Sequence, residues 1–158
     1  MQDNAAPPPA EDSAMPFAIR PTLPGDAPAL SGLLGQLGYS VTERQVAQRL
    51  ALITASGGSV LAAEDASGAI KGCVQAAVDL RLAEGRMAEL VSLVVDDSCR
   101  GQGLGRLLVD AVAEWARAQG FTALRVRCNV VRDDARSFYQ RLGFTALKEQ
   151  AVLLKPLA

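Results

Sequence analysis

The stretch Arg100-Gly101-Gln102-Gly103-Leu104-Gly105 lies between an apolar run, Leu90 to Val95, and an amphipathic run that begins at Arg106. The pattern predicts a strand, a glycine turn and a helix. Such a turn directs free backbone N–H groups, and the positive end of a helix dipole, at one small volume. Glycines let a ligand approach the amides and adopt backbone angles that other residues avoid. We therefore expect a loop that binds a phosphate or pyrophosphate.

Two well-known phosphate loops have different spacings. A Walker loop requires Gly-x-x-x-x-Gly-Lys-Ser/Thr, and no lysine follows these glycines. A dinucleotide fold requires Gly-x-Gly-x-x-Gly and a later acidic residue, whereas the spacing from Gly101 is Gly-x-Gly-x-Gly. The first is excluded and the second fits poorly. An ordinary strand-to-helix turn stays open for the loop taken alone.

A second motif follows at Ala135-Arg136-Ser137-Phe138-Tyr139-Gln140-Arg141-Leu142-Gly143-Phe144. Together the two motifs resemble the GNAT superfamily of N-acyltransferases. The glycine loop is similar to that family's acetyl-CoA signature, Gln/Arg-x-x-Gly-x-Gly/Ala, and the second motif to its Ala-x-x-x-Tyr-x-x-x-Gly-Phe segment. The resemblance extends from Ile19 to Leu154 when the spacing of elements is included. It implies acetyl-CoA as co-substrate, no metal, and direct attack of an amine on the thioester.

The resemblance also implies which residues bind the cofactor. The backbone of the preceding strand would pair with the pantetheine arm, the loop would bind the pyrophosphate, and Asn129 would end the opposing strand and bond the arm. A simple turn role for Asn129, and solvated surface roles for Arg100 and Arg106, stay open. The expected cofactor-binding residues are Leu93, Val94, Val95, Arg100, Gly101, Gln102, Gly103, Leu104, Gly105, Arg106 and Asn129.

Two side chains carry the expected chemistry. Glu89 occupies the place of a catalytic glutamate in the family's histone-acetylating branch, and alternation puts it on one face with Val91, Leu93 and Val95. Apolar neighbours would raise its pKa and suit it to accept a proton. Tyr139 matches the family's general acid, which protonates the leaving thiolate. A solvated Glu89 and a merely half-buried Tyr139 are the structural alternatives.

Composition excludes several classes of protein. The chain has 158 residues, enough for one domain, with 16 Lys+Arg against 17 Asp+Glu, so it lacks the basic field of a nucleic-acid binder. It has no histidine, which excludes Ser-His-Asp and Cys-His hydrolases. Three cysteines without a Cys-x-x-Cys pair argue against a disulfide framework or zinc site. The absence of a long apolar stretch predicts a soluble, cytoplasmic protein.

The order of patterns predicts a mixed α/β fold. Met1 to Pro16 is read as a disordered leader and residues 17–158 as one acetyltransferase domain. We expect a GNAT-like central sheet, mixed but mostly antiparallel, of six to seven strands flanked by about four helices. Strands are expected at 17–20, 59–64, 69–80, 86–95, 121–128 and 146–154, and helices at 27–37, from 42, at 103–119 and from 132 or 133 to 143.

The sequence says little about which amine accepts the acetyl group. Tyr39 and the Gly38 to Glu43 loop border the acceptor entrance in the resembling family, and acidic groups at Asp79 and Glu84, beside Arg81, would favour a cationic amine. A solvent-exposed hairpin would show the same pattern. We expect an N-acetyltransferase for a primary amine of a small molecule, or of a peptide. A non-catalytic acetyl-CoA sensor and a structural domain that dimerises through strand edges are the alternatives, and the enzyme is itself compatible with a homodimer.

Overall fold

The computed structural model describes residues 16–158, so all but the last residue of the expected leader, Met1 to Pro16, lies outside the described residues. Its elements are β1 (Phe17–Pro21), the 3-10 turn η1 (Pro24–Asp26), α1 (Ala27–Gln36), α2 (Glu43–Ala55), β2 (Ser59–Asp65), β3 (Ile70–Arg81), β4 (Gly85–Val95), the 3-10 turn η2 (Asp97–Cys99), α3 (Leu104–Ala118), β5 (Leu124–Val126) and α4 (Asp133–Arg141).

The five strands form one sheet in the order β1-β2-β3-β4-β5. Neighbours are antiparallel from β1 to β4, because short turns join β2, β3 and β4 as a meander. β5 alone runs parallel to its neighbour β4, after the crossover through α3. The mixed, mostly antiparallel sheet and the four α-helices confirm the expected fold class. The sheet of the described residues has fewer strands than the six to seven expected.

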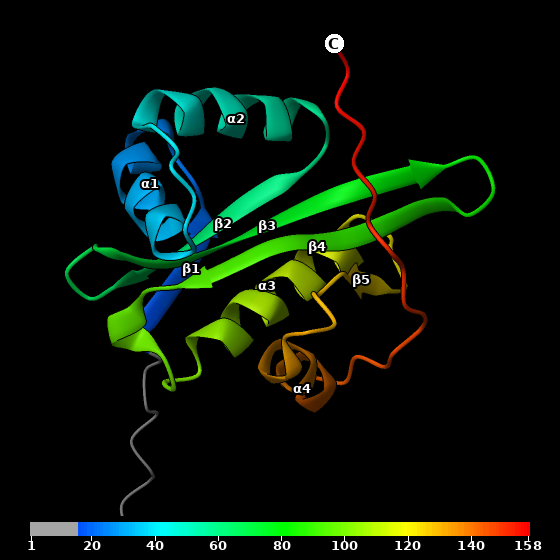
Figure 1. Cartoon of the computed structure of the whole chain (residues 1–158). Helices are drawn as coiled ribbons and strands as arrows, with labels where there is room; N and C mark the ends of the chain where they lie inside the picture. The colour runs from blue at the N-terminus through cyan, green and yellow to red at the C-terminus, as the bar shows by residue number, and fades with distance from the viewer. Residues whose placement is uncertain (1–15) are drawn as a thin grey trace, which may run out of the picture.

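The helices cover the two faces of the sheet unequally (Figure 1). α3 and α4 lie on one face, where Leu90 of β4 packs with Leu104, Leu108 and Val112 of α3 in the main core cluster. α1 and α2 lie on the other face, where Leu30 and other helix residues pack against the sheet in a smaller cluster. The hairpin end of β3 and β4 projects beyond α1 and α2 (Figure 1), so that part of their face is left without a covering helix.

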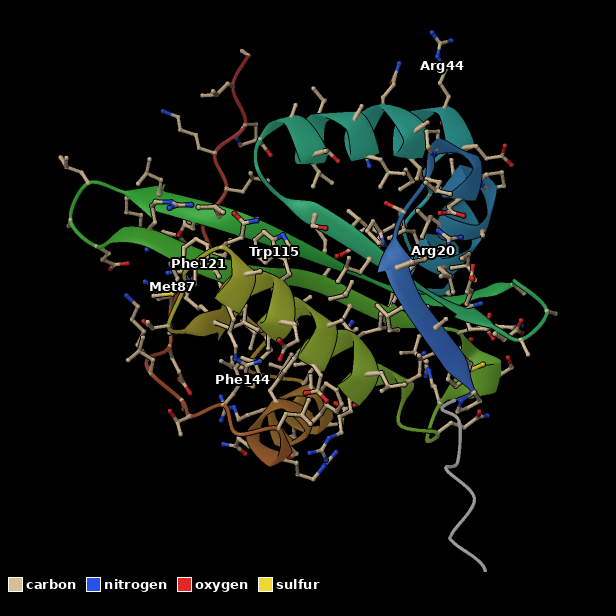
Figure 2. All side chains as sticks on the ribbon, turned by 180° about the vertical axis from the view of Figure 1, so that it is seen from behind. Arg20, Arg44, Met87, Trp115, Phe121 and Phe144 are labelled. Carbon is tan, nitrogen blue, oxygen red and sulfur yellow. The ribbon has the colours of Figure 1, made fainter. Side chains whose placement is uncertain are left out.

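α3 forms where the apolar residues recur every three or four positions. Leu104, Leu108, Val112 and Ala116 are all buried on the face towards the sheet. Burying each large aliphatic side chain stabilises the fold by roughly 1.5–3 kcal/mol. Near the C-terminal end of the helix, Trp115 of α3 stacks with Phe121, which follows the helix, with ring centroids 6.4 Å apart (Figure 2). The helix predicted at 103–119 is confirmed.

α2 begins as its sequence predicts. The hydroxyl of Thr42 accepts from the backbone N–H of Gln45 at 3.2 Å, while the Gln45 side chain accepts from the Thr42 N–H at 3.0 Å. This reciprocal pair satisfies two N–H groups that the first turn of a helix leaves without partners. The helix start expected at residue 42 is therefore correct to one residue.

A β-bulge at Val91 changes which face the residues of β4 occupy. In the ladder with β3, Gln75 is opposite Ser92 and Ala76 is opposite Leu90, so Val91 has no partner. One extra residue reverses the alternation of side chains. Leu90 before the bulge, and the apolar residues that follow at 93 and 95, all pack on the α3 side. The prediction that Glu89 shares its face with Val91, Leu93 and Val95 is wrong for this reason.

The strand predicted at residues 146–154 is also wrong. No strand is assigned there, and Leu147, Val152, Leu153 and Leu154 are each more than four-fifths exposed. Strand preference expresses how well a side chain packs against neighbouring strands, and this segment has no neighbour. The strand predicted at 121–128 is real but is hydrogen-bonded only over Leu124–Val126.

Candidate active site

The glycine loop connects the end of β4 to the start of α3. Gly101 and Gly103 have φ angles of 75° and 79°, a left-handed conformation that side chains with a Cβ rarely adopt. A Cβ placed on either glycine would meet nothing within 4 Å. The loop is therefore open on its outer side, and the room beside its backbone is what a phosphate-binding loop requires.

The first turn of α3 supplies the donors. The N–H of Leu107 is bonded to the carbonyl of Gly103 at 3.2 Å, and the helical N–H groups before it have no carbonyl to reach within the helix. The side chain of Leu104 is buried in the core, so only its backbone faces a ligand. This donor set, together with the helix dipole, fits the pyrophosphate of acetyl-CoA.

Gly105 has a different role from the other two glycines. A Cβ at this position would lie 3.2 Å from the ring of Phe138, which is closer than ordinary packing allows. The missing side chain lets α4 pack against the first turn of α3. The two sequence motifs are thus in direct contact in the fold, because the second motif forms α4.

Two polar side chains of the loop, Arg100 and Gln102, make local contacts. Arg100 forms an ion pair with Asp97 at 2.6 Å, with both side chains more than half exposed. The side chain of Gln102 donates to the carbonyl of Ser98 at 3.3 Å. Arg106 is exposed on the first turn of α3. An incoming phosphate would compete with Asp97 for the Arg100 guanidinium.

The loop is anchored to α1 by Gln36. Its side-chain amide donates to Asp96 at 3.1 Å and accepts from the backbone N–H of Asp97 at 3.0 Å. Asp96 also accepts from the backbone N–H of Ser98 at 2.9 Å. The hydroxyl of Ser98 and the amide of Gln36 lower the pKa of Asp96 to about 2, so the anchor is charged at neutral pH. Sequence reasoning missed Gln36, because nothing local to α1 indicates a partner sixty residues away.

β4 and β5 separate beyond Leu90. Their parallel ladder ends with Leu90 opposite Val126, and the next five residues of β4, Val91–Val95, have no partner on that side. Val94 is buried towards α1, whereas Leu93 and Val95 pack on the α3 side. Their side chains belong to the core, so their backbone groups are what this open edge offers to a ligand. We call the point where the two strands part the fork.

The open edge joins the glycine loop to the fork. Five extended residues span roughly 16 Å at about 3.3 Å per residue. This span is comparable with an extended pantetheine arm, and unpaired strand groups can hold such an arm as a further strand would. Asn129 follows the fork on the other side, where its side chain accepts from the N–H of Val131 at 3.1 Å. That contact is the turn role left open for Asn129.

Tyr139 lies in α4 between two aromatic rings. Phe138 and Phe144 contact it edge to face, with centroids 5.0 and 5.4 Å away. Burial, and secondarily the nearby Cys128 thiol, raises the pKa of Tyr139 to about 12. The phenol therefore keeps its proton at neutral pH, as a general acid must. Its ring packs against the main core cluster on the α3 side of the sheet.

Glu89 lies at the fork, but its surroundings are charged. The Nε of Arg125 donates to its carboxylate at 3.0 Å, and Arg127 approaches the other oxygen at 3.4 Å. Glu89 is only 13% exposed, and Asp79 contacts the same Arg125. The prediction of apolar neighbours for Glu89 is wrong, because the bulge and the pairing of Glu89 with Arg125 in the ladder set its contacts.

Sequence reasoning missed the arginine partners as site residues. Arg125 and Arg127 alternate with apolar residues in the predicted strand 121–128, which is typical of a strand with one wet or ligand-facing side, but the pattern does not say what the arginines contact. Arg125 lowers the pKa of Asp79 by hydrogen bonding, and Arg81 adds to this at 2.8 Å. The carboxylates suggested for a cationic acceptor, Asp79 and Glu84, are thus paired with arginines of the protein itself.

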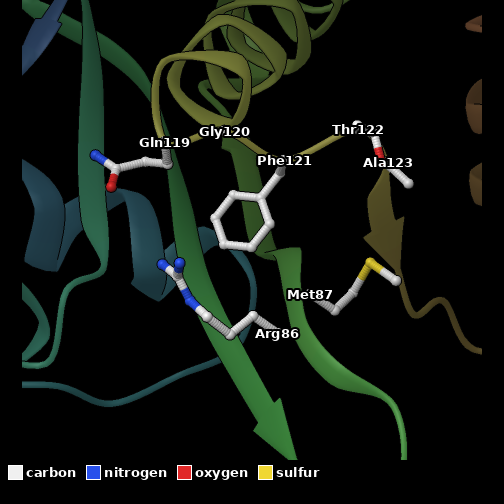
Figure 3. Close-up of a pocket in the computed structure, with 7 residues that line it drawn as sticks. All are labelled: Arg86, Met87, Gln119, Gly120, Phe121, Thr122 and Ala123. Atoms are coloured by element: carbon white, nitrogen blue, oxygen red, sulfur yellow. The ribbon is translucent and has the colours of Figure 1, made fainter.

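Two other regions lie outside this constellation. Tyr39, between α1 and α2, is 62% exposed, and its N–H donates to the carbonyl of Leu34. A hollow of about 240 Å³ lies where α3 leads into β5, with the guanidinium of Arg86 5.0 Å from the ring of Phe121 (Figure 3). It adjoins the start of β4, at the opposite end of that strand from the glycine loop.

None of the helices in the described part of the chain has the length and apolar character that a membrane span requires.

Comparison with known proteins agrees with this geometry. The model of the Acetyltransferase (GNAT) family matches residues 34–144. Glucosamine 6-phosphate N-acetyltransferase 1 of Oryza sativa subsp. japonica is 32% identical over 136 residues, which cover 81% of each chain. An uncharacterised N-acetyltransferase of Bacillus subtilis is 33% identical over 69 residues, 43% of this chain and about half (47%) of the relative.

Solved structures show the same fold. Glucosamine-6-phosphate N-acetyltransferase from Arabidopsis thaliana has a TM-score of 0.76 at 23% identity, covering 87% of this chain and 97% of the other. An aminoglycoside acetyltransferase from an uncultured soil metagenomic sample has a TM-score of 0.75 at 22% identity, covering 90% and 97%. The chain belongs to the acetyltransferase (GNAT) family of acyltransferases.

Proposed function

We propose that this protein transfers an acetyl group from acetyl-CoA to a primary amine of a small molecule, by direct attack in a ternary complex. The observation that carries the proposal is the unpaired edge of β4, which runs from the glycine loop to the fork where Glu89 lies. The names of the rice and Arabidopsis relatives and of the metagenomic enzyme describe acetylation of an amino sugar and of aminoglycosides, which supports a small amine as acceptor.

Acetyl-CoA supplies an already activated thioester, so the protein does not need a nucleophile of its own. The glycine loop and the first turn of α3 bind its pyrophosphate, and the backbone of β4 orients its arm towards the fork. Holding the thioester beside the amine converts an encounter in solution into a positioned reaction. The role left to the side chains is to move protons.

The reaction balances with one proton transfer to sulfur. The amine nitrogen forms a bond to the carbonyl carbon, the carbon–sulfur bond breaks, and the proton lost from nitrogen is matched by one gained at sulfur. A backbone N–H of β4 at the fork end of the open edge would polarise the carbonyl, rather than one near Val95, because Val95 lies at the loop end. Glu89, or a water that it holds, accepts the proton from nitrogen, and Tyr139 gives its proton to the departing thiolate.

The pairing of Glu89 bears on its role as base. Arg125 donates to one oxygen of Glu89, and Arg127 lies 3.4 Å from the other, so an amine that contacts Glu89 directly would compete with Arg127 for that second oxygen. Arg125 is held by three contacts and Arg127 by longer ones. Arg127 is therefore the partner that moves.

A thiol-release assay tests the proposal. Acetyl-CoA is supplied with a panel of amines that contains amino sugars, aminoglycosides, polyamines, amino acids and short peptides. We expect acetyl-CoA-dependent release with at least one small amine, and formation of its N-acetyl product by mass spectrometry. Binding of CoA without any product would instead identify a sensor, and product only from peptides would move the acceptor to another class.

A further inference from the structure

The face of the sheet at the fork carries a balanced group of charges. Three carboxylates and three arginines lie on β3, β4, β5 and the turns next to them, and we call this set the fork cluster. Its members are Asp79, Arg81, Glu84, Glu89, Arg125 and Arg127. Because the two signs match in number, the cluster offers no net negative field for a cation, and the contacts of each arginine decide what it can bind.

All three guanidinium nitrogens of Arg125 contact carboxylates of the protein. Its guanidinium bonds Glu89 through Nε and Nη2, contacts Asp79 through Nη2, and lies 3.8 Å from Glu84 through Nη1. Its side chain is 18% exposed. Such a residue joins β3, β4 and β5 and has little capacity for a further ligand.

Arg127 contacts the same two carboxylates as Arg125, but its contacts are longer and its side chain is more exposed. Its side chain is 54% exposed, and its nearest contacts are 3.4 Å to Glu89 and 3.7 Å to Asp79, beyond an ordinary charged hydrogen bond. A guanidinium has five N–H donors in a planar fork, which fits the two oxygens of a carboxylate or phosphate. Most of the donors of Arg127 are therefore available, at the point where β5 leaves β4.

The fork cluster is also accessible. α3 and α4 cover the opposite face of the sheet, and the hairpin end of β3 and β4 extends beyond α1 and α2 (Figure 1). Arg127 is the most exposed arginine of the fork cluster, and it lies 3.4 Å from Glu89. A molecule that approaches across this face therefore meets Arg127 beside Glu89.

We infer that the acceptor is a primary amine that also carries an anionic group, a carboxylate or a phosphate, and that Arg127 binds this group. The inference rests on the proposed acetyl transfer at the fork. Binding the anion draws Arg127 away from Glu89 and frees one carboxylate oxygen, while Arg125 keeps the other in place. The anion thus orients the amine and releases the group that accepts its proton.

Matched pairs of amines test this assignment. Glucosamine 6-phosphate is compared with glucosamine for a phosphate, and glycine with glycinamide for a carboxylate, in thiol-release kinetics with acetyl-CoA. We expect the anionic member of one pair to have a kcat/KM about 10- to 100-fold higher, since hydrogen bonds to charged groups have this magnitude. The pair that shows the preference identifies which anion the site takes.

Variants at Arg127 locate the effect. Arg127→Gln is expected to remove most of the preference by raising KM for the anionic member, and Arg127→Lys to restore part of it, because lysine keeps the charge without the planar fork. Arg117→Gln is the matched control: Arg117 is exposed and paired with Glu114 on α3, away from the fork. It should leave both members of each pair unchanged.

Titration calorimetry on the CoA complex measures binding of the acceptor amine without catalytic turnover. The anionic member of each pair is titrated into the wild type and Arg127→Gln, each saturated with CoA. Tighter binding of an anionic member, weakened by Arg127→Gln, supports the inference. Equal behaviour of both members in both pairs, no binding of either anion, or an unchanged preference in Arg127→Gln overturns it. The proposed transfer fails separately, if anions bind and no amine of the wider panel is acetylated.

Discussion

The two ends of the open β4 edge offer different kinds of functional group. At the glycine loop the binding groups belong to the backbone, and Gly101 and Gly103 shape them through left-handed φ angles. At the fork the functional groups are side chains, and their contacts depend on how β4 and β5 pair and on a bulge at Val91. The position of backbone binding groups follows from a local sequence pattern. The contacts of side chains on a strand depend on how that strand pairs with its neighbours in the sheet. The following changes test that contrast, from the largest expected effect to the smallest.

Gly103→Glu should strongly weaken CoA binding at the loop end. A side chain there meets a φ of 79° and places a carboxylate where the phosphates bind. Losing two charge-assisted hydrogen bonds, each worth about 1.5 kcal/mol, lowers affinity by roughly 100-fold. Calorimetry with CoA measures the change. Gly120→Glu is the control, because Gly120 has a similar φ of 83° and open surroundings at the other end of α3. Equal losses in both variants would show that strain, not ligand contact, is responsible.

Tyr139→Phe should slow the reaction at the fork without changing CoA binding at the glycine loop. The phenol that protonates sulfur is lost, while the aromatic packing with Phe138 and Phe144 is kept. A general acid contributes about 100-fold or more to the rate. We therefore expect kcat to fall by roughly this factor with the CoA affinity unchanged. An unaltered kcat in Tyr139→Phe would mean that solvent or another group protonates the thiolate.

Arg125→Met should lower the free energy of unfolding of the protein, rather than act on the glycine loop. It leaves Glu89, which is 13% exposed, with only the longer contact to Arg127, and a partly buried charge that loses its main partner costs about 1–3 kcal/mol. Urea unfolding at pH 7 measures this loss. Arg117→Met, which breaks an exposed pair, should cost less than about 1 kcal/mol. A similar small cost for Arg125→Met would show that the fork cluster does not hold β5 to the sheet.

The Arg125 effect should also depend on pH. Arg125 lowers the pKa of Asp79 in the folded state, so this contribution to stability is complete above the ordinary carboxyl pKa of about 3.9 and is lost as the pH falls below it. The difference in unfolding free energy between wild type and Arg125→Met should narrow between pH 5 and pH 3. A difference that stays constant over this range would exclude the ionised carboxylate as its source.

Gln36→Ala should have the smallest effect, at the loop end. Its two hydrogen bonds hold Asp96 and Asp97 but do not contact the ligand. Without them the loop must be ordered on binding, and we expect CoA affinity to fall by roughly 2- to 10-fold, the equivalent of one ordinary hydrogen bond. Gln48→Ala, on the exposed side of α2, serves as the control. If both variants bind CoA like the wild type, α1 does not support the loop.

The sequence was sufficient for the loop and for most of the fold. The glycine turn, the periodicity of α3 and the start of α2 at residue 42 are set by local patterns, and the structure has each within one residue of the predicted position. The surroundings of Glu89 were not predictable, because simple alternation fails at a bulge that only the ladder with β3 reveals. The segment 146–154 shows the same limit, since its apolar residues gave a strand pattern without providing a partner.

Backbone NMR on the amide groups tests the central claim most directly, because that claim concerns amides. With CoA added to the wild-type protein, we predict that the largest shifts fall on Gly101 to Arg106 and on Val91 to Val95, and that Phe121 to Ala123 beside the hollow hardly change. Shifts concentrated at the hollow, with the glycine loop and the open edge of β4 unaffected, would contradict the account.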